Sequence, residues 1–352
     1  MLKTAVPIGS SSAHGEADFR QVADFVVECE SLGVDTVWTG EAWGMDAMTP
    51  LAYMAARTSK IRLCTGIASV SARSPGNLAM TAMTIAALSN NRFVLGLGVS
   101  GPQVVEGLHG VSFAKPLGRM KELIDILKLA FAGEPLKYDG EHYKLPLPGG
   151  TNKALKIGQA PNPNIPIFLA TLGPKSLEYT GEVADGWLGH SFTPSTADVY
   201  LDPIRRGAEQ AGRDFGAMEI AVGVVVGIGD DVEKMIAKRK PAIAFQLGAM
   251  GTADTNFYTE AFRRTGYQVD AVNEVQRLWV AGKREEAAAR VPDEMALETS
   301  IIGTDEMVRD RLRKYRASGV TLLQIQAMGR SPERKLETIG RINELIREVE
   351  GV

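Results

Sequence analysis

The sequence predicts an α/β protein built as a (β/α)8 TIM barrel, and three observations support this fold class. Short, almost continuously apolar segments alternate with amphipathic segments along the 352 residues. Strands that are apolar on both faces are typical of a parallel sheet covered by helices. No internal repeat with a period of roughly 20 to 50 residues is visible, which argues against a solenoid. The alternation gives eight strands, and this number favours a barrel over a doubly wound sheet.

The expected strands are short apolar runs that end at glycine, proline or polar residues. They lie at Leu2 to Ile8, Val34 to Trp38, Ile61 to Ile67, Phe93 to Leu97, Ile167 to Ala170, Gly186 to Gly189, Met218 to Ile228 and Thr321 to Gln326.

The expected helices carry apolar residues at intervals of three and four. They lie at Glu16 to Leu32, from Thr49 onward, and at about Asn77 to Leu88, Leu117 to Phe131, Pro174 to Ala184, Ser195 to Ala211, Val232 to Leu247, Asp305 to Ala317 and Pro332 to Val349. Thr49 is the expected N-cap of the second helix because Pro50 suits a first helical position.

Two segments interrupt the alternation. Ala132 to Pro166 holds six prolines and five glycines around the hairpin-like sequence KYDGEHYKL. A polar, helical excursion begins near Thr252 and continues beyond Arg290, to about residue 300. We interpret both segments as insertions into a single domain of residues 1–352, at about 132–166 and 252–300, that cover the barrel mouth.

Composition narrows the partners to a small molecule. A net charge of -3 provides no general attraction for nucleic acid or an anionic membrane. No apolar run is long enough for a membrane helix and no leader pattern follows Met1, so we expect a cytoplasmic protein. Cys29 and Cys64 are too few for a disulfide framework and are expected as buried thiols. The four histidines form no metal-binding motif, so no metal is expected.

The reacting groups of such a barrel lie at the carboxyl ends of its strands. In this chain those positions are mostly glycine, serine, alanine or aromatic residues, with few titratable side chains. A hydrolase or a metal enzyme would bring carboxylates or histidines together there. A weakly charged mouth is instead typical of a flat cofactor that carries the reaction itself.

Two of the loops suit an anion or a planar group. Gly173 and Pro174 precede a helix whose free N–H groups favour phosphate, with Lys175 and Ser176 in its first turn. The segment GVSGPQ exposes main-chain N–H groups beside the Ser100 hydroxyl. Each loop could equally be an ordinary helix start or a tight turn. Gly96, Gly98 and Gly101 spell G-x-G-x-x-G, but three strand-helix units precede them, so a Rossmann fingerprint is not expected.

Several segments together resemble one protein family. They are Val37 to Trp43, Ser71 to Pro75, RFVLGLGVSGPQVVEG, LGPKSLEYTGEVADGWL and SGVTLLQIQ. These segments resemble the luciferase-like flavin and deazaflavin oxidoreductases, and especially the branch that uses coenzyme F420. The resemblance extends over nearly the whole chain and implies a barrel of the luciferase-like type, with a homodimer as the expected assembly.

The resemblance also implies a set of cofactor-binding residues at the strand ends. A non-prolyl cis peptide, seen in several relatives at the end of the third strand, would fall between Gly66 and Ile67. The residues implied to line the cofactor or hold its phosphate are Gly66, Ile67, Gly98, Ser100, Gly101, Gln103, Thr171, Gly173, Pro174, Lys175 and Ser176.

The chain departs from its relatives at the expected proton-transferring groups. Some relatives carry an Asp-His pair after the second strand, where this chain has Glu41 and Ala42. Glu41 is a candidate proton acceptor, or it hydrogen-bonds the cofactor or a neighbouring loop. His190, at the end of the sixth strand, is a candidate proton donor, or a polar residue at the rim.

The leading hypothesis is a coenzyme F420-dependent oxidoreductase that transfers hydride between C5 of the deazaflavin and a small organic substrate. The first alternative is a two-component monooxygenase that uses FMN and molecular oxygen. The second is a flavin- or deazaflavin-binding barrel without turnover.

Overall fold

The computed structural model describes residues 1–8, 18–249 and 256–351 and divides into two compact units. Unit 1 comprises Met1–Val6, Ser31–Val34 and Thr171–Val352, and unit 2 comprises Pro7–Glu30 and Asp35–Ala170. Each unit is described by itself.

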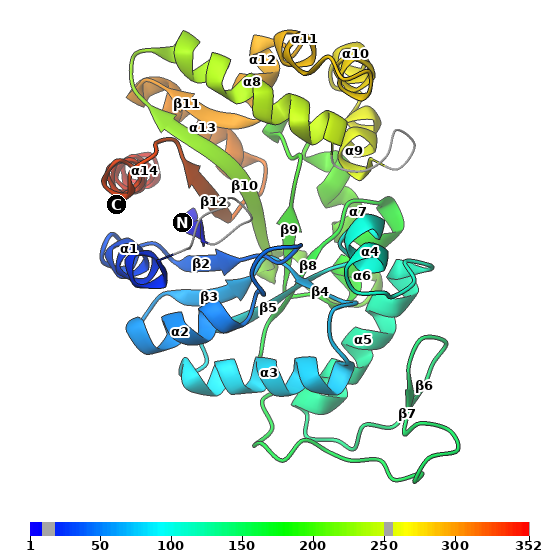
Figure 1. Ribbon diagram of the computed structural model, residues 1–352. Helices are drawn as coiled ribbons and strands as arrows, with labels where there is room; N and C mark the ends of the chain where they lie inside the picture. Colours follow the sequence, from blue (N-terminus) through cyan, green and yellow to red (C-terminus); the bar gives the residue numbers. More distant parts are fainter. Residues whose placement is uncertain (9–17, 250–255, 352) are drawn as a thin grey trace. The chain divides into compact units, whose positions relative to one another are not determined.

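Unit 2 is built on parallel strands in the order β2-β3-β5-β8, with the two-residue strand β4 also paired with β5. Its strands are β2 (Thr36–Thr39), β3 (Arg62–Thr65), β4 (Ala68–Ser69), β5 (Phe93–Gly98) and β8 (Ile167–Ala170). Its helices are α1 (Phe19–Ser31, which ends one residue beyond the unit), α2 (Thr49–Arg57), α3 (Pro75–Leu88), α4 (Pro102–Gly107) and α5 (Pro116–Phe131). The expected hairpin is confirmed as the antiparallel pair β6 (Tyr138–Asp139) and β7 (Lys144–Leu145) (Figure 1).

Unit 1 is organised around the ten-residue strand β10, which pairs in parallel with β9, β11 and β12. Its strands are the first four residues of β1 (Lys3–Ile8), then β9 (Gly186–Gly189), β10 (Glu219–Ile228), β11 (Ser300–Gly303) and β12 (Leu322–Ala327). Its α-helices are α6 (Pro174–Val183), α7 (Asp198–Gln210), α8 (Val232–Ala249), α9 (Phe257–Thr265), α10 (Val269–Val280), α11 (Arg284–Ala289), α12 (Asp293–Glu298), α13 (Asp305–Ala317) and α14 (Pro332–Glu350). Two short 3₁₀ helices are η1 (Pro194–Thr196) and η2 (Phe215–Ala217).

The predicted (β/α)8 barrel class is confirmed. All eight expected strands are present as β1, β2, β3, β5, β8, β9, β10 and β12, and each is followed in the chain by at least one helix. Strands β8 and β9 have the predicted bounds, and both are almost fully buried. No helix within residues 1–8, 18–249 and 256–351 is long and apolar enough to cross a bilayer.

Several details differ from the sequence prediction. Strand β11 and helix α4 were not expected, because each has only four to six residues and too few turns or alternations to leave a pattern. The N-cap of α2 is Met48 rather than Thr49. The Asp46 carboxylate accepts hydrogen bonds from the amides of Met48 and Thr49, both at 2.8 Å, so it satisfies two of the free donors at this helix start. The predicted starts at Glu16 and Thr252 lie outside the described residues.

The predicted excursion is a helical layer with a hydrophobic core of its own. Helices α10, α11 and α12 gather along α8 in Figure 1. The fully buried residues of this hydrophobic core include Ala244, Leu247, Val272, Val275, Ala287, Met295 and Ala296. Ile302 of β11 packs into the same cluster. Both cysteines are buried free thiols, as expected.

Candidate functional site

In unit 2, the ends of β3 and β5 meet at a cis peptide. The bond between Gly66 and Ile67 is cis, which confirms the expectation from the resemblance. A Cβ at Gly66 would lie 2.3 Å from Cε3 of Trp38, and a Cβ at Gly98 would lie 3.0 Å from Cγ1 of Ile67. Glycine at residue 66 therefore leaves room for the Trp38 indole, and glycine at residue 98 lets the Ile67 side chain lie directly against the end of β5.

The loop after β5 places Ser100, Gly101 and Gln103 at the start of α4. Ser100 has a left-handed backbone with φ of 60°, which is uncommon for a residue with a side chain. Gly101 is the N-cap of α4, and a Cβ there would lie 3.4 Å from Oε1 of Gln103. Unit 2 thus places these three residues in one short turn that continues from Gly98.

Glu41 lies beside the cis peptide and its carboxylate is fully engaged. Its amide donates to the Ile67 carbonyl at 3.2 Å. Its carboxylate accepts two hydrogen bonds from Arg73 at 2.7 and 2.9 Å, one from the Ser69 amide at 2.8 Å and one from the Ala47 amide at 3.0 Å. Only 8% of the Glu41 side chain is exposed. Four donors occupy the roughly four lone-pair sites of a carboxylate.

Burial acts to lower the pKa of Arg73, but the hydrogen bonds and charge of Glu41 outweigh it and hold that pKa above its usual value. The sequence singled out Glu41 and not its partner. In the sequence, the segment Ser71 to Pro75 is informative only as part of the family resemblance. Nothing in its spacing indicates that Arg73 donates hydrogen bonds to Glu41, 32 residues earlier in the chain.

In unit 1, Thr171 to Ser176 lead into helix α6. Gly173 is the N-cap and makes no side-chain cap, so the amides of Lys175 and Ser176 remain available at the positive end of the helix. Lys175 is exposed and has no ion-pair partner among the described residues. The hydroxyl of Ser176 donates to the Gly173 carbonyl at 2.8 Å. The buried Thr171 hydroxyl is paired with that of Thr180 at 2.7 Å, so it is directed into the protein.

His190 follows β9 in a turn that three other elements hold in place. The next residue, Ser191, has a left-handed φ of 57°. Its carbonyl accepts from the Tyr200 hydroxyl at 3.2 Å, and its hydroxyl accepts from the Gln246 amide at 3.0 Å. Tyr258 of α9 packs edge-on against the imidazole, with ring centroids 5.9 Å apart.

The imidazole of His190 is exposed, yet the protein atoms around it lower its pKa below the usual 6.5 through desolvation. At pH 7 the ring is therefore neutral, with one nitrogen as donor and the other as acceptor. Sequence reasoning found His190 but missed Tyr258, which lies in the excursion where the pattern is weakest.

The predicted site residues thus form three groups. Unit 2 brings together Glu41, Gly66, Ile67 and Gly98, with the Ser100 to Gln103 turn adjoining Gly98. In unit 1, Thr171 to Ser176 form one helix start and His190 lies in the turn after β9. Within the part of the chain that the structure describes, no three His, Cys, Asp or Glu side chains are arranged to hold a metal ion.

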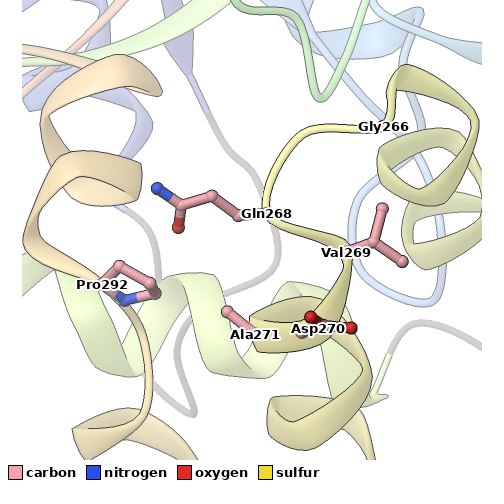
Figure 2. A pocket seen from close by; sticks show the side chains of 6 residues that line it. All are labelled: Gly266, Gln268, Val269, Asp270, Ala271 and Pro292. Carbon is pink, nitrogen blue, oxygen red and sulfur yellow. The ribbon is translucent and has the colours of Figure 1, made fainter.

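A separate hollow of about 570 Å³ lies between α9 and α10, lined by Gly266, Gln268, Val269, Asp270, Ala271 and Pro292. Figure 2 shows the Gln268 side chain turned into the space beside Pro292. None of the predicted site residues lines it, and the hollow is wide open.

Comparison with known proteins gives consistent results for sequence and structure. Residues 2–322 match the family model described as luciferase-like monooxygenase. A Mycobacterium tuberculosis protein provisionally named a coenzyme F420-dependent oxidoreductase is 41% identical over 90% of this chain and 93% of its own length. The 5,10-methylenetetrahydromethanopterin reductase of Archaeoglobus fulgidus is 28% identical over 92% of this chain and 94% of its own.

Among solved structures, the coenzyme F420-dependent tetrahydromethanopterin reductase of Methanopyrus kandleri superposes with a TM-score of 0.79 at 22% identity. The match covers 96% of this chain and 97% of that one, so the two share a fold. With the family model matching nearly the whole sequence, the chain belongs to the luciferase-like monooxygenase family.

Proposed function

We propose that the chain is a coenzyme F420-dependent oxidoreductase acting on a small organic molecule. The observation that supports the proposal is the cis peptide between Gly66 and Ile67, whose Ile67 side chain packs against Gly98, because these uncharged residues would support a planar ring. The 41% identity to a relative named as F420-dependent favours the deazaflavin over other planar cofactors. We also propose that residues 1–352 act as one functional domain, with insertions at about 132–166 and 252–300.

The residues present fit such a cofactor. A side chain at Gly98 would press on Ile67, so the surface against the ring would be lost with any larger residue there. Ser100, Gly101 and Gln103 would contribute hydrogen bonds from the adjoining turn. The amides of Lys175 and Ser176, with the Lys175 ammonium, would hold a phosphate through the dipole of α6. When bound, the deazaflavin supplies or accepts hydride at its C5.

The side chains of the protein would then position the cofactor and the substrate, exclude water and transfer a proton. The four hydrogen bonds of Glu41 favour a positioning role over proton acceptance, because no lone pair is left for a proton. Glu41 would fix the segment from Ile67 to Ser69 behind the ring. A neutral, exposed His190 is better suited to transfer a proton to or from a substrate.

Titration with F420 and with FMN, followed by fluorescence, tests the proposal. We expect tighter binding of F420, and reduction or oxidation of F420 when a panel of enones, imines and alcohols is added. Tighter binding of FMN with oxygen-dependent turnover would instead establish the monooxygenase that the family description names. Tight F420 binding without turnover of any panel member would indicate a binding protein.

The proposal that the start of α6 holds the phosphate of the cofactor is tested separately. Lys175→Ala should weaken F420 binding by at most about fivefold, because the ammonium is exposed and screened, and the loss should shrink at high salt. Lys153→Ala, at another exposed lysine, in unit 2, is the matched control. Equal affinities of the two variants would remove the helix start from the proposal.

We also propose a homodimer, on family resemblance alone, and a cytoplasmic location, as the sequence pattern predicts. Light scattering on the purified protein measures the mass, and a value of one 37.9 kDa chain would exclude the dimer.

A further inference from the structure

Beside His190, the strands of unit 1 leave a space that a side chain would fill. The register pairs Val222 with Gly189 across β10 and β9, and Gly223 with Gln324 across β10 and β12. Gly223 therefore lies level with Gln324 on one side and with the residue after β9, His190, on the other. Since paired residues of parallel strands share a face, the three positions converge.

The distances confirm this convergence. A Cβ built on Gly223 would lie 3.3 Å from Oε1 of Gln324 and 3.9 Å from Cε1 of His190. Both side chains are thus within 4 Å of one point, and glycine keeps that point free. Gly223 itself is exposed, as is His190.

His190 and Gln324 bring polar groups to this point, and Tyr258 lies against the imidazole. Within the described part of the chain, neither the imidazole of His190, nor the amide of Gln324, nor the hydroxyl of Tyr258 is hydrogen-bonded to another residue. Tyr258 is nevertheless held firmly. The Asn256 side chain caps α9 by accepting from the amides of Tyr258 and Thr259, and its amide donates to the Leu247 carbonyl at 2.8 Å. The cap thereby fixes the backbone that carries the tyrosine ring, and the ring packs edge-on against the imidazole.

We propose that His190, Tyr258 and Gln324 form a subsite that receives a neutral oxygen of the substrate, a carbonyl or a hydroxyl, in the space beside Gly223. This inference rests on the proposed function and specifies the substrate class. All three side chains are uncharged, so they offer hydrogen bonds but no opposite charge to a phosphate, carboxylate or ammonium. A carbonyl oxygen accepts from Tyr258 or His190, and a hydroxyl can also donate to Gln324.

Nuclear magnetic resonance can test the subsite directly, because the chain has only four histidines. The Cε1–H signal of His190 is assigned by its loss in His190→Gln. The probes share one ring: cyclohexanone and cyclohexanol are neutral, whereas cyclohexanecarboxylate and cyclohexylammonium are charged. We expect the two neutral probes to shift the His190 signal in the full-length protein and the two charged probes to leave it unchanged.

Variants then distinguish the hydrogen bond of the Tyr258 hydroxyl from the packing of the Tyr258 ring. Tyr258→Phe should weaken cyclohexanone binding about three- to tenfold, the effect of one neutral hydrogen bond, while the His190 signal without probe stays in place. Tyr258→Leu should move that signal even without probe, because the ring against the imidazole is gone. Gly223→Ala should weaken binding at least about tenfold by filling the space.

Two matched variants control for general effects. Tyr53→Phe removes an exposed hydroxyl from α2, and Gly340→Ala adds a methyl group that would meet only Leu32, at 3.6 Å. Both should bind cyclohexanone as the wild type does. The proposal is overturned if cyclohexanone leaves the His190 signal unchanged, if the charged probes bind equally well, or if Tyr258→Phe binds with wild-type affinity.

Binding of F420 is measured in a separate experiment, by the fluorescence of the cofactor. Loss of F420 binding with intact probe shifts at His190 would reject the proposed function and leave the subsite standing. Normal F420 binding without probe shifts would reject the subsite alone.

Discussion

The guanidinium of Arg73 donates two hydrogen bonds to the carboxylate of Glu41, with nitrogen–oxygen distances of 2.7 and 2.9 Å. The pair is largely buried, with 16% of the Arg73 side chain and 8% of the Glu41 side chain exposed. It connects the end of β2 with the loop that precedes α3, on the side of the cis peptide where Glu41 also binds Ile67 and Ser69.

Removing Arg73 should therefore destabilise the protein. Arg73→Met leaves a buried carboxylate with only two main-chain donors, and we expect the free energy of unfolding to fall by about 3 kcal/mol. Arg73→Lys should lower the free energy of unfolding by less, although lysine cannot reproduce the two parallel hydrogen bonds of the guanidinium. Urea denaturation measures both, with Arg334→Met at an arginine whose side chain is 76% exposed as the control. Equal midpoints for Arg73→Met and Arg334→Met would contradict the prediction.

Adding a methyl group at Gly66 should be poorly tolerated. The new Cβ would lie 2.3 Å from the buried indole of Trp38, so that ring has to shift, and overpacking of this kind costs about 1 to 3 kcal/mol. Gly98→Ala, with a contact of 3.0 Å to Ile67, should cost less. Gly107→Ala has no heavy atom within 4 Å of the added carbon and should be neutral or stabilising. Thermal unfolding of the three variants would test this order, and a Gly66→Ala melting point at or above that of Gly107→Ala would refute it.

His190 should make stability depend on pH in a narrow window. Desolvation lowers its pKa in the folded state below the value near 6.5 of the unfolded chain, so the unfolded state binds more protons between the two values. Stability is then complete above about pH 6.5 and falls as the pH drops toward the folded pKa. In His190→Gln, the contribution of this residue to the pH dependence of the unfolding free energy should be absent. Urea midpoints between pH 5 and 8 measure it, and a wild-type His190 pKa at or above 6.5 by magnetic resonance would argue against the prediction.

Ser100 offers an internal comparison of two substitutions. Its φ of 60° favours glycine and strongly disfavours a β-branched side chain. Ser100→Gly should leave the free energy of unfolding within about 1 kcal/mol of the wild type, whereas Ser100→Val should lower it by about 1 to 3 kcal/mol. Under the proposed function, both should also weaken F420 binding, because both remove the hydroxyl. Equal stability of the two variants would mean that the backbone at residue 100 is not left-handed in solution.

The sequence was sufficient for elements whose pattern is local. Strands β8 and β9 are short apolar runs between proline, glycine and polar residues, so their limits could be predicted residue by residue. Strand β11 has only four residues, and nothing but pairing with the extended end of β10 makes it a strand. A clue was available in Thr304, which caps α13, because Ser300 to Gly303 is the apolar run immediately before that cap.

The site was predictable in the same uneven way. The open start of α6 depends on Gly173 and Pro174, which are visible in the sequence, whereas the cis peptide at Gly66 was expected only from the family resemblance. Partnerships between distant side chains are not visible in the sequence. Neither the approach of Arg73 to Glu41 nor that of Tyr258 to His190 has a signature along the chain, because each is fixed by the path of the backbone between them.

The hydrophobic cluster shared by α8, α10, α11 and α12 has a consequence for evolution. Its apolar contacts are made mostly among these helices, with Ile302 and Met328 as attachments to the strands beneath. Outward-facing residues of this layer can therefore be exchanged while the strands keep their sequence. Under the proposed function, in which the inserted helices cover the site, a lineage would acquire different substrates through changes in this layer alone.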